Sequence, residues 1–417
     1  MTLTRPGEYL RAIEFLFPRT TTIKFGLERT EQLLELVGNP EQVVPTIHVG
    51  GTNGKGSATA LIAAALEAAG FQVGVYTSPH LVDFRERITV GGAPISESAV
   101  AMWTDRLRPL IESSGATFFE AATAIALADM AARGAEIGVI EVGLGGRLDS
   151  TNVVRPLVSG VTKIALDHQK YLGNTLEAIA REKAWIAKPG APFVIGDRDP
   201  AIVEVLKAEA RRSVAALAPG VRADVRVLPP EYLWDGPLGL AGHHQRRNAA
   251  VAYGILMALP ERFRPSRAAV DRGFGSAFVP GRLDRRGRWL FDVAHNPDGV
   301  RALVAALDDL KPPGPIHALV SILGDKDWAD MLVHLDKVVD RGVLTVAPTA
   351  AGRRWDLSWL RRWLERADRP QARAQWRLIE DFPEALETVA GGAGTILVTG
   401  SFHTVGDVLA ARGLAPI

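Results

Sequence analysis

Short apolar runs alternate with longer segments whose apolar residues recur at helical spacing along most of the chain. Runs of this kind are typical of buried strands, and the longer segments are typical of amphipathic helices. The predicted strands lie at residues 46–50, 71–77, 137–143, 157–164, 191–195, 289–294, 316–323, 342–346 and 395–399. Because helical segments separate most of these runs, we expect an α/β fold with mainly parallel sheets.

Residues 1–44 predict two amphipathic helices, and residues 88–95 predict a small surface hairpin. Residues 213–240 are punctuated by proline and glycine, and their pattern predicts no element. The remaining helices are expected at residues 58–69, from 96, at 117–133, from 175, and at 200–212, 249–259, 298–310, 327–339, 356–367, 382–390 and 404–412.

The pattern breaks at Phe278-Val279-Pro280-Gly281-Arg282, where a Pro-Gly pair marks a turn, and the alternation of strands and helices then restarts. A chain of 417 residues has room for two or three domains of roughly 150 residues each. We therefore expect a larger domain over residues 1–279, a linker over 280–283, and a smaller, doubly wound α/β domain over 284–417.

Composition narrows the classes of protein to consider. Hydrophobic residues make up 47% of the chain, and the net charge of +1 gives no general attraction to nucleic acid. The absence of cysteine excludes disulfides and thiolate metal sites. No apolar run approaches the ~18 residues of a membrane span, and Met1 to Tyr9 has no apolar signal core. We expect a monomeric, cytoplasmic protein with small-molecule partners and with neither nucleic acid nor membrane as a partner.

The stretch Thr46–Ser57 begins as a predicted strand, becomes a loop rich in glycine, and leads into a strongly helix-forming segment. This arrangement cradles phosphate through backbone N–H groups, and Lys55 can reach the β- and γ-phosphates. The strict P-loop spacing is not met, because Val49 stands where the first glycine belongs and Gly56 occupies the Ser/Thr position. A glycine-rich turn without a ligand is the alternative, but the order of strand, lysine, hydroxyl and helix favours nucleotide binding.

Polar residues follow several predicted strands, at the edge where ligands bind in α/β sheets. They include Ser78, His80, Glu141 and His168. A carboxylate at the end of an apolar strand is costly to bury alone, and beside a phosphate loop its natural partner is Mg²⁺. From the residues alone, a salt-bridged Glu141 and structural roles for Ser78 and His80 remain open.

Motifs spread over nearly the whole chain match a single family in its own order. They are Gly51-Thr52-Asn53-Gly54-Lys55-Gly56-Ser57, Thr77-Ser78-Pro79-His80-Leu81, Glu141-Val142-Gly143-Leu144-Gly145-Gly146-Arg147-Leu148-Asp149, Leu166-Asp167-His168-Gln169, Arg181-Glu182-Lys183-Ala184, Pro280-Gly281-Arg282, Asp292-Val293-Ala294-His295-Asn296-Pro297 and Gly400-Ser401-Phe402-His403. Together they resemble the dihydrofolate synthase / folylpolyglutamate synthase family, the folate branch of the Mur ligase superfamily.

The resemblance implies a P-loop ATPase domain followed by a glutamate-ligase domain, with Mg²⁺ as the cofactor. The residues implied at ATP are Gly54, Lys55, Gly56, Ser57, Asn248, Arg282 and Asp292, and those implied at Mg²⁺ are Ser78, Glu141 and His168. The residues implied at the pterin-side pocket are Thr117, Phe118, Phe119, Glu120, Leu148, Asp149 and Ser150, although spacing alone favours a core position for the two phenylalanines. Lys183 matches a lysine that is carbamylated in the family, and His295 and Ser401 are candidates for contacting glutamate.

The implied reaction is the ATP-dependent addition of L-glutamate to dihydropteroate and to folylpolyglutamates. Transfer of the γ-phosphoryl group to a carboxylate makes an acyl phosphate, and the glutamate amine then displaces phosphate. Lys55, Mg²⁺ and Arg282 would supply the positive charge that this transfer requires. Folylpolyglutamate synthase activity alone and a P-loop ATPase without ligase activity stay open. A cell-wall Mur ligase is disfavoured, because residues 1–44 are too short for its extra N-terminal domain.

Overall fold

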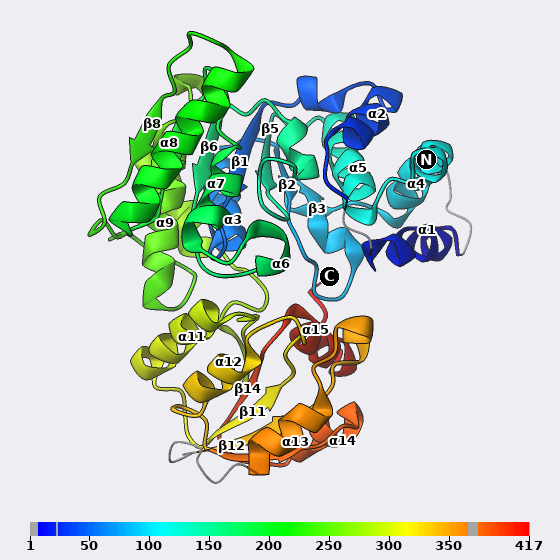
Figure 1. The fold of residues 1–417 in the computed structure, drawn as a ribbon, viewed down its shortest axis with the longest axis vertical. Coiled ribbons are helices and arrows are strands. Elements are labelled where there is room, and N and C mark those ends of the chain that lie inside the picture. The colour runs from blue at the N-terminus through cyan, green and yellow to red at the C-terminus, as the bar shows by residue number, and fades with distance from the viewer. Residues whose placement is uncertain (1–6, 22–23, 366–373, 417) are drawn as a thin grey trace. The chain divides into compact units, whose positions relative to one another are not determined.

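A computed structural model describes residues 7–21, 24–365 and 374–416. The chain forms two compact units. The larger unit contains the described residues up to His80, residues 84–239 and residues 246–277, and the smaller unit contains Leu81–Asp83, Leu240–Gln245 and the chain from Phe278. Each unit is an α/β structure, as the sequence predicts (Figure 1).

Eight strands form the sheet of the larger unit, in the order β4-β3-β2-β5-β1-β6-β7-β8. They are β1 Thr46–Gly50, β2 Val73–Tyr76, β3 Ile88–Val90, β4 Ala93–Pro94, β5 Ile137–Glu141, β6 Val158–Val161, β7 Phe193–Ile195 and β8 Val225–Val227. The strands from β2 to β8 along the sheet are parallel, and β3 and β4 add an antiparallel edge. The loops after β1, β2, β5 and β6 therefore leave the same edge of the sheet.

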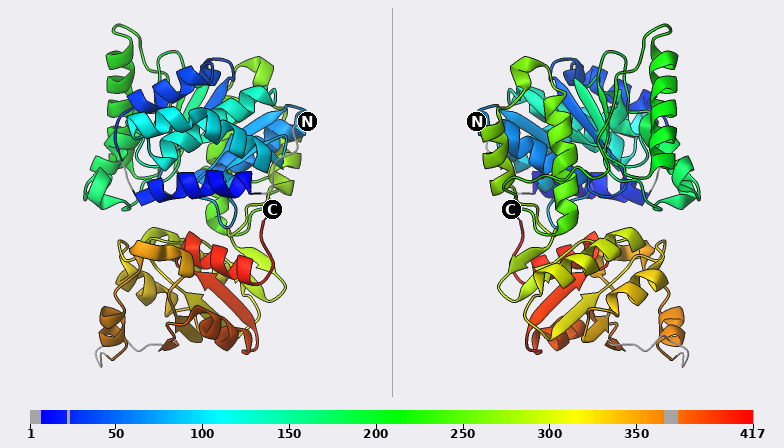
Figure 2. Two further views of the ribbon diagram at one scale, coloured as in Figure 1. Left: turned by 90° about the vertical axis from the view of Figure 1, so that its right-hand side faces the viewer. Right: turned by 90° about the vertical axis from the view of Figure 1, so that its left-hand side faces the viewer.

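Helices cover both faces of this sheet (Figures 1 and 2). One face carries α3 Lys55–Ala68, α9 His243–Met257 and α10 Arg267–Ser276, and the other carries α5 Phe118–Ala132, α7 Leu176–Ala184 and α8 Pro200–Leu217. The helices α3 and α10 pack closely, because a Cβ at Gly273 would lie only 2.4 Å from the carbonyl oxygen of Ala64. On the opposite face, Met130 of α5 lies against Gly74 of β2 and Gly138 of β5.

The N-terminal helices enlarge the α5 side of the larger unit. α1 Glu8–Leu16, α2 Glu28–Leu36 and α4 Glu97–Ser114 share one hydrophobic cluster with α5, and Leu16, Leu33, Leu107 and Ile125 are among its members. Arg29 of α2 bonds Glu120 in the first turn of α5, which ties α2 to the start of α5. Shorter helical elements are η1 Phe17–Thr21, η2 Pro40–Gln42, η3 Phe84–Arg87, η4 Ser150–Val153, α6 Gln169–Leu172 and η5 Glu261–Phe263.

The smaller unit has a six-stranded sheet in the order β13-β12-β11-β14-β10-β9, parallel except for β9. The strands are β9 Asp284–Arg286, β10 Trp289–Phe291, β11 Ile316–Val320, β12 Arg341–Leu344, β13 Gln375–Leu378 and β14 Thr395–Thr399. Two separate hydrophobic clusters show that helices cover both faces. One cluster holds α11 Pro297–Leu310, α12 Trp328–Leu335 and α13 Leu357–Glu365, and the other holds α14 Phe382–Ala390 and α15 Phe402–Ala411. A 3₁₀ helix, η6, spans Pro348–Arg353.

Several local predictions differ from the structure. The helix predicted at 249–259 begins six residues earlier, at His243, so Asn248 lies within a helix. The hairpin at 88–95 is part of the main sheet, because β3 pairs with β2. The sequence analysis missed β8, β9, β13 and α10, which are short or rich in charged residues. The predicted helix at 356–367 is seen as far as Glu365, and its last two residues lie outside the described residues.

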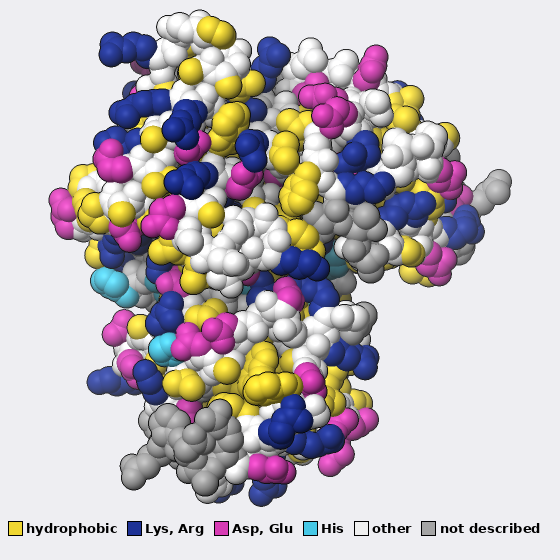
Figure 3. All heavy atoms as spheres, viewed as in Figure 1, with side chains coloured by type: hydrophobic (Ala, Val, Ile, Leu, Met, Phe, Trp, Pro, Cys, Tyr) yellow, Lys and Arg dark blue, Asp and Glu magenta, His cyan; other side chains and the backbone are white. Residues whose placement is uncertain are grey.

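The face shown in Figure 3 carries lysine and arginine interspersed with aspartate and glutamate, as expected for a net charge of +1. Among the described residues, no helix has the length and apolar character needed to cross a membrane.

Candidate functional site: a phosphate loop and the sheet edge beside it

The loop after β1 has the backbone geometry of an anion-binding turn. Gly51 and Gly54 have φ values of +132° and +93°, which favour glycine. A Cβ at Gly51 would lie 1.9 Å from Thr162 Oγ1, and a Cβ at Gly54 would lie 2.3 Å from Asn248 Oδ1. Both positions therefore need glycine for space as well as for conformation. Because α3 begins at Lys55, the loop ends at a helix N-terminus, where backbone N–H groups favour an anion.

Hydrogen bonds to the segment directly after β6 fix the loop. The backbone N–H groups of Thr52 and Asn53 donate to the carbonyl of Lys163 at 2.8 and 3.3 Å, and Thr162 Oγ1 donates to the carbonyl of Asn53 at 2.8 Å. Lys55 Nζ lies over the loop and donates to the carbonyl of Thr52 at 3.3 Å. An ammonium group has three donors, so this bond is compatible with phosphate binding at the same head group.

Glu141 lies at the end of β5, paired in register with Val49 of β1. Its side chain is buried, and its Oε2 accepts a hydrogen bond from the backbone N–H of Ser78 at 3.3 Å. A Cβ at Gly56 would lie 3.6 Å from the same oxygen, so the carboxylate faces the first turn of α3. The structure thus brings Gly56, Ser78 and Glu141 together, and Ser57 is buried in that same turn.

The donors gathered at this edge suit a hard divalent cation. The Glu141 carboxylate and the Ser78 hydroxyl are oxygen ligands of the kind that Mg²⁺ prefers. His168 is the N-cap residue of α6 with φ of +51°, and its Nε2 lies 4.0 Å from Asp167 Oδ1. Within the described parts of the chain, no three His, Asp or Glu side chains are already arranged to hold a metal. The assignment of His168 to the metal therefore stays a prediction.

Lys183 of α7 is a buried lysine near the loop. Burial, and less strongly the positive charge of Lys55, lowers the pKa of Lys183 from 10.5 to about 7, while the charges of Asp167 and Asp149 oppose the shift. A large neutral fraction at neutral pH follows, and a neutral amine is the form that reacts with electrophiles. The loop after β5 lies directly on this part of α7, because a Cβ at Gly146 would lie 3.0 Å from the Cα of Lys183.

Asp149 organises the same loop. Its buried carboxylate accepts the backbone N–H groups of Leu144 at 2.6 Å and Thr151 at 3.0 Å, together with the Thr151 hydroxyl. Thr151 is also 2.8 Å from His48 Nε2, and His48 is fully buried in β1. Burial, and less strongly the charge of Lys188, lowers the pKa of His48 to about 3. The sequence analysis missed this neutral histidine, whose position in an apolar strand is also typical of core residues.

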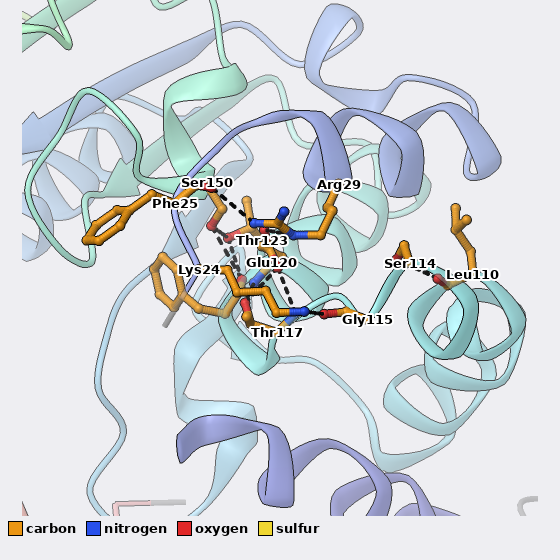
Figure 4. Close-up of polar contacts among 11 residues, drawn as sticks. Lys24, Phe25, Arg29, Leu110, Ser114, Gly115, Thr117, Glu120, Thr123 and Ser150 are labelled. Carbon is orange, nitrogen blue, oxygen red and sulfur yellow. Dashed lines mark hydrogen bonds and ion pairs between the residues drawn. The ribbon is translucent and has the colours of Figure 1, made fainter. Parts of the chain in front are cut away.

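The segments predicted to line the pterin-side pocket meet at the start of α5 (Figure 4). Thr117 and Glu120 form a reciprocal capping box, and Glu120 also accepts Arg29 Nε at 2.8 Å. The Glu120 carboxylate is therefore already bound within the protein. Thr123 Oγ1 lies 2.7 Å from Ser150 Oγ, which joins α5 to the loop after β5 (Figure 4).

The two phenylalanines at this point have different surroundings. Phe118 is buried and stacks on Phe17, with ring centroids 5.4 Å apart, so the expected core position holds for it. Phe119 is partly buried, and its ring occupies the space beside Gly143, where a Cβ would lie 2.2 Å from Phe119 Cζ. Leu148, by contrast, is 38% exposed. Contact of these segments with a substrate stays a prediction.

The predicted residues of the smaller unit cluster around two strand ends. Asp292 follows β10 and accepts the backbone N–H groups of Leu283 and Ala294, both at 3.0 Å. Burial raises the pKa of Asp292, and the nearby charge of Arg282 opposes that shift. The Phe402 ring lies 5.5 Å from the Arg282 guanidinium and 5.4 Å from the His295 ring.

Ser401 follows β14 and caps α15, where its buried hydroxyl bonds Thr404 at 2.7 Å. This hydroxyl is already bound within the protein, so the predicted contact with glutamate would have to come from the neighbouring backbone or from a shared bond. Arg282, Asp292 and His295 lie within one unit, and their predicted roles remain predictions.

Comparisons with known proteins agree with these motifs. The Mur ligase middle domain matches residues 49–256, and the Mur ligase glutamate ligase domain matches residues 281–402. A dihydrofolate synthase/folylpolyglutamate synthase of Bacillus subtilis is 32% identical over 413 residues, covering 93% of this chain and 94% of the relative. This chain belongs to the dihydrofolate synthase/folylpolyglutamate synthase family of Mur ligases. A probable bifunctional folylpolyglutamate synthase/dihydropteroate synthase of Haloferax volcanii is 34% identical over 358 residues, and the chain spans 42% of its length.

Solved structures show the same fold over the whole length. Mycobacterium tuberculosis folylpolyglutamate synthase complexed with ADP has a TM-score of 0.84 and 31% identity, with 99% of each chain covered. A bifunctional folylpolyglutamate synthase/dihydrofolate synthase with Mn, AMPPNP and L-glutamate bound has a TM-score of 0.80 and 30% identity, covering 99% of this chain and 100% of that one.

Proposed function

We propose that this protein is an ATP-dependent ligase that adds L-glutamate to dihydropteroate, forming dihydrofolate, and to folylpolyglutamates. The observation that carries the proposal is the phosphate loop together with the buried Glu141 carboxylate, which faces the first turn of α3 after that loop. The bifunctional assignment rests on the Bacillus subtilis relative, of which this chain covers 94%. We also retain a monomeric state and a cytoplasmic location as proposals.

The loop residues bind and orient the nucleotide. The backbone N–H groups of Gly54, Lys55, Gly56 and Ser57 would surround the phosphates, and Lys55 Nζ would neutralise charge on the γ-phosphoryl group. The Asn248 side chain lies against Gly54, where a Cβ would be 2.3 Å from its Oδ1, and we propose that it supports the loop conformation. Arg282 and Asp292 are proposed as further contacts to the nucleotide.

Ser78, Glu141 and His168 are the residues proposed to hold a divalent cation, which we take to be Mg²⁺. When bound, such an ion neutralises charge on the phosphates and orients them for transfer. The structure with bound Mn and AMPPNP supports a divalent metal with the nucleotide in this family. In this chain the backbone N–H of Ser78 fixes the orientation of the Glu141 carboxylate before an ion arrives.

Lys183 is proposed to be carbamylated. Its pKa of about 7 leaves much of the amine neutral at neutral pH, and a neutral amine adds to CO₂ with loss of one proton. The product is an anion in place of a cation beside Lys55. This change removes the repulsion between the two lysines and adds a negative group that can orient the cation site.

The acyl substrate and glutamate would be held by the remaining predicted residues. Thr117–Glu120 and Leu148–Ser150 are proposed to contact the pterin side of the substrate, and His295 and Ser401 to contact glutamate. The substrate carboxylate takes the γ-phosphoryl group of ATP, ADP leaves, and the glutamate amine then displaces phosphate from the acyl phosphate. Exclusion of water from that intermediate protects it from hydrolysis.

A phosphate-release assay with ATP and Mg²⁺ tests the proposal. Dihydropteroate and tetrahydrofolate are supplied separately, with and without glutamate, and the amide products are identified by mass spectrometry. We expect both acids to give glutamate-dependent release with one amide formed per phosphate. If phosphate is released with tetrahydrofolate but not with dihydropteroate, the protein has no dihydrofolate synthase activity. Phosphate release that does not depend on glutamate would indicate an ATPase that makes no amide bond.

A further inference from the structure

Arg87 is a buried arginine for which the motifs suggest no role. It is the last residue of η3, and its side chain is 7% exposed. The backbone N–H of Thr77 donates to the Arg87 carbonyl at 2.9 Å, which places Arg87 beside the end of β2. Since Tyr76 of β2 pairs with Ile140 of β5, the next residue along β5 is Glu141. Arg87 therefore lies at the same sheet edge as the candidate cation site.

The guanidinium of Arg87 has only part of its donor capacity used within the protein. Nε donates to His80 Nδ1 at 2.7 Å, and the Phe118 ring centroid lies 5.1 Å from the guanidinium carbon. Among residues 7–21, 24–365 and 374–416, no group accepts a hydrogen bond from Nη1 or Nη2, and no carboxylate forms an ion pair with them. A guanidinium stays charged when buried, and a buried charge without an anion hydrogen-bonded to it is costly. The arrangement is that of an anion site.

The neighbours of Arg87 define which anion fits. The Phe118 ring lies against the guanidinium, and Phe118 belongs to the segment Thr117–Glu120 that we propose for the pterin side of the substrate. Glu141 and Ser78, which we propose for the metal bound to the phosphates, lie at the same sheet edge as Arg87. Burial lowers the pKa of Arg87, and the neighbouring Tyr76, Glu86 and Glu141 oppose that shift, with Glu141 the weakest of the three. The substrate group that must lie between an aryl ring and the γ-phosphoryl group is the carboxylate that becomes phosphorylated.

We infer that Arg87 binds the reacting carboxylate of the acyl substrate through Nη1 and Nη2. The inference rests on the proposed ligase function and adds a recognition residue to it. A planar guanidinium matches both oxygens of a carboxylate and fixes their orientation. His80 holds the guanidinium plane through Nε, so Arg87 is oriented before the substrate arrives. The same two nitrogens would face the acyl oxygen after phosphorylation.

The inference is tested by comparing an acid with its uncharged analogue. Isothermal titration calorimetry with AMPPNP and Mg²⁺ present measures the Kd of dihydropteroate and of its primary carboxamide. We expect the wild-type protein to prefer the acid by ~10-fold or more, the size of a charge-assisted hydrogen bond. In Arg87→Gln the preference should fall to about twofold, while the Kd of AMPPNP is unchanged. Arg87→Lys keeps the charge but loses the two parallel N–H donors of the guanidinium, and it should give an intermediate preference.

Arg85→Gln is the matched control. Arg85 lies two residues earlier in the same short helix, is partly exposed, and is 3.7 Å from Glu97. This variant should keep the full preference for the acid. A second control, His80→Ala, removes the support of Nε, and it should weaken the preference less than Arg87→Gln does.

Three results would overturn the inference. The first is a folded Arg87→Gln protein that keeps the wild-type ratio of the two Kd values, and the second is a variant that loses AMPPNP affinity with the ratio intact, which would indicate phosphate binding. The third is a loss of preference for the acid in His80→Ala as large as that in Arg87→Gln, which would indicate that Arg87 acts only by positioning His80. If Arg87→Gln does not fold, the ratio in Arg87→Lys decides in the same way. Failure of the proposed function is separate, because a wild-type protein that forms no amide from dihydropteroate would reveal it.

Discussion

At the scale of single residues, the candidate site combines buried ionisable groups, one of which has a strongly lowered pKa. Glu141 and Lys183 are both about 4% exposed; Glu141 is proposed to hold a cation, and Lys183 is an amine with a pKa of about 7. Sequence motifs indicated both residues. The sequence could not indicate the charge state of Lys183, because that depends on burial and on the nearby charge of Lys55.

Glu141→Ala should reduce turnover by ~10²-fold or more, because the variant removes a carboxylate that the charge-neutralising cation would need. The protein should keep its thermal stability, since replacing a buried carboxylate by a small apolar group removes a desolvation cost. Initial rates of phosphate release and circular dichroism melting measure the two effects. Near-normal turnover in this variant would contradict the proposed role.

Lys183→Ala should be largely inactive and should regain part of its activity when a small carboxylate such as acetate is added. The added anion would replace the carbamate in the space left by the side chain. Lys188→Ala is the control, because Lys188 is also a substantially buried lysine but bonds the carbonyl of Asn152, outside the candidate site. The turnover rate of Lys188→Ala should be the same with and without acetate. Full activity of Lys183→Ala without any additive would refute carbamylation as a requirement.

His48 should make the free energy of unfolding depend on pH. Its pKa is about 3 in the folded protein, whereas an ordinary histidine, as in the unfolded chain, has a pKa of 6.5. Between these two pH values the unfolded chain therefore binds a proton that the folded protein does not. Stability from this group is complete above pH 6.5 and falls as the pH drops toward 3, with a loss of about 2 kcal/mol by pH 5. Urea unfolding at pH 7 and pH 5 should show this loss in the wild-type protein and a smaller one in His48→Gln. Equal losses in both proteins would show that His48 is not the group responsible.

At the scale of secondary-structure elements, the sequence predicted the main strands and helices because their apolar periodicity is strong. It missed β8 and β13, which carry charged residues in short strands, and α10, which contacts α3 through a glycine. It also placed the start of α9 too late, since His243–Asn248 is polar and gives no apolar period. The contact between Asn248 and Gly54 joins two distant segments and has no signal in the local pattern.

Gly54→Ala should disable the phosphate loop. The residue has φ of +93°, and a Cβ would lie 2.3 Å from Asn248 Oδ1, so either the loop or α9 must shift. The backbone strain alone costs ~1–2 kcal/mol. We expect the Kd of AMPPNP, measured by calorimetry, to rise ~10-fold or more, which corresponds to a loss of ~1.4 kcal/mol of binding free energy.

Gly70→Ala is the control for this variant. Gly70 follows the other end of α3 with φ of +97°, and a Cβ there would meet no atom within 4 Å. It should lose similar stability and keep the wild-type Kd for AMPPNP. Equal effects of the two substitutions on AMPPNP binding would show that general backbone strain, and not the loop contact, is responsible.

At the scale of the whole molecule, two α/β units carry complementary parts of one proposed reaction. The larger unit has the phosphate loop, Glu141, Lys183 and the segments proposed for the acyl substrate, and the smaller unit has Arg282, Asp292 and His295. The motifs in the sequence predicted that the ATP and acyl-substrate residues lie mainly in the first domain and the glutamate residues in the second. Arg87 was not indicated, because its significance comes from burial beside Phe118 and His80, which no motif records.

The central claim is that the acid is activated by phosphoryl transfer before the amine attacks. Dihydropteroate labelled with ¹⁸O in both carboxylate oxygens tests it directly, with ATP, Mg²⁺ and glutamate present and the released phosphate analysed by mass spectrometry. The account predicts that each phosphate carries one ¹⁸O from the substrate carboxylate, in step with amide formation. Phosphate that carries no ¹⁸O from the substrate, with its new oxygen derived from water, would contradict it.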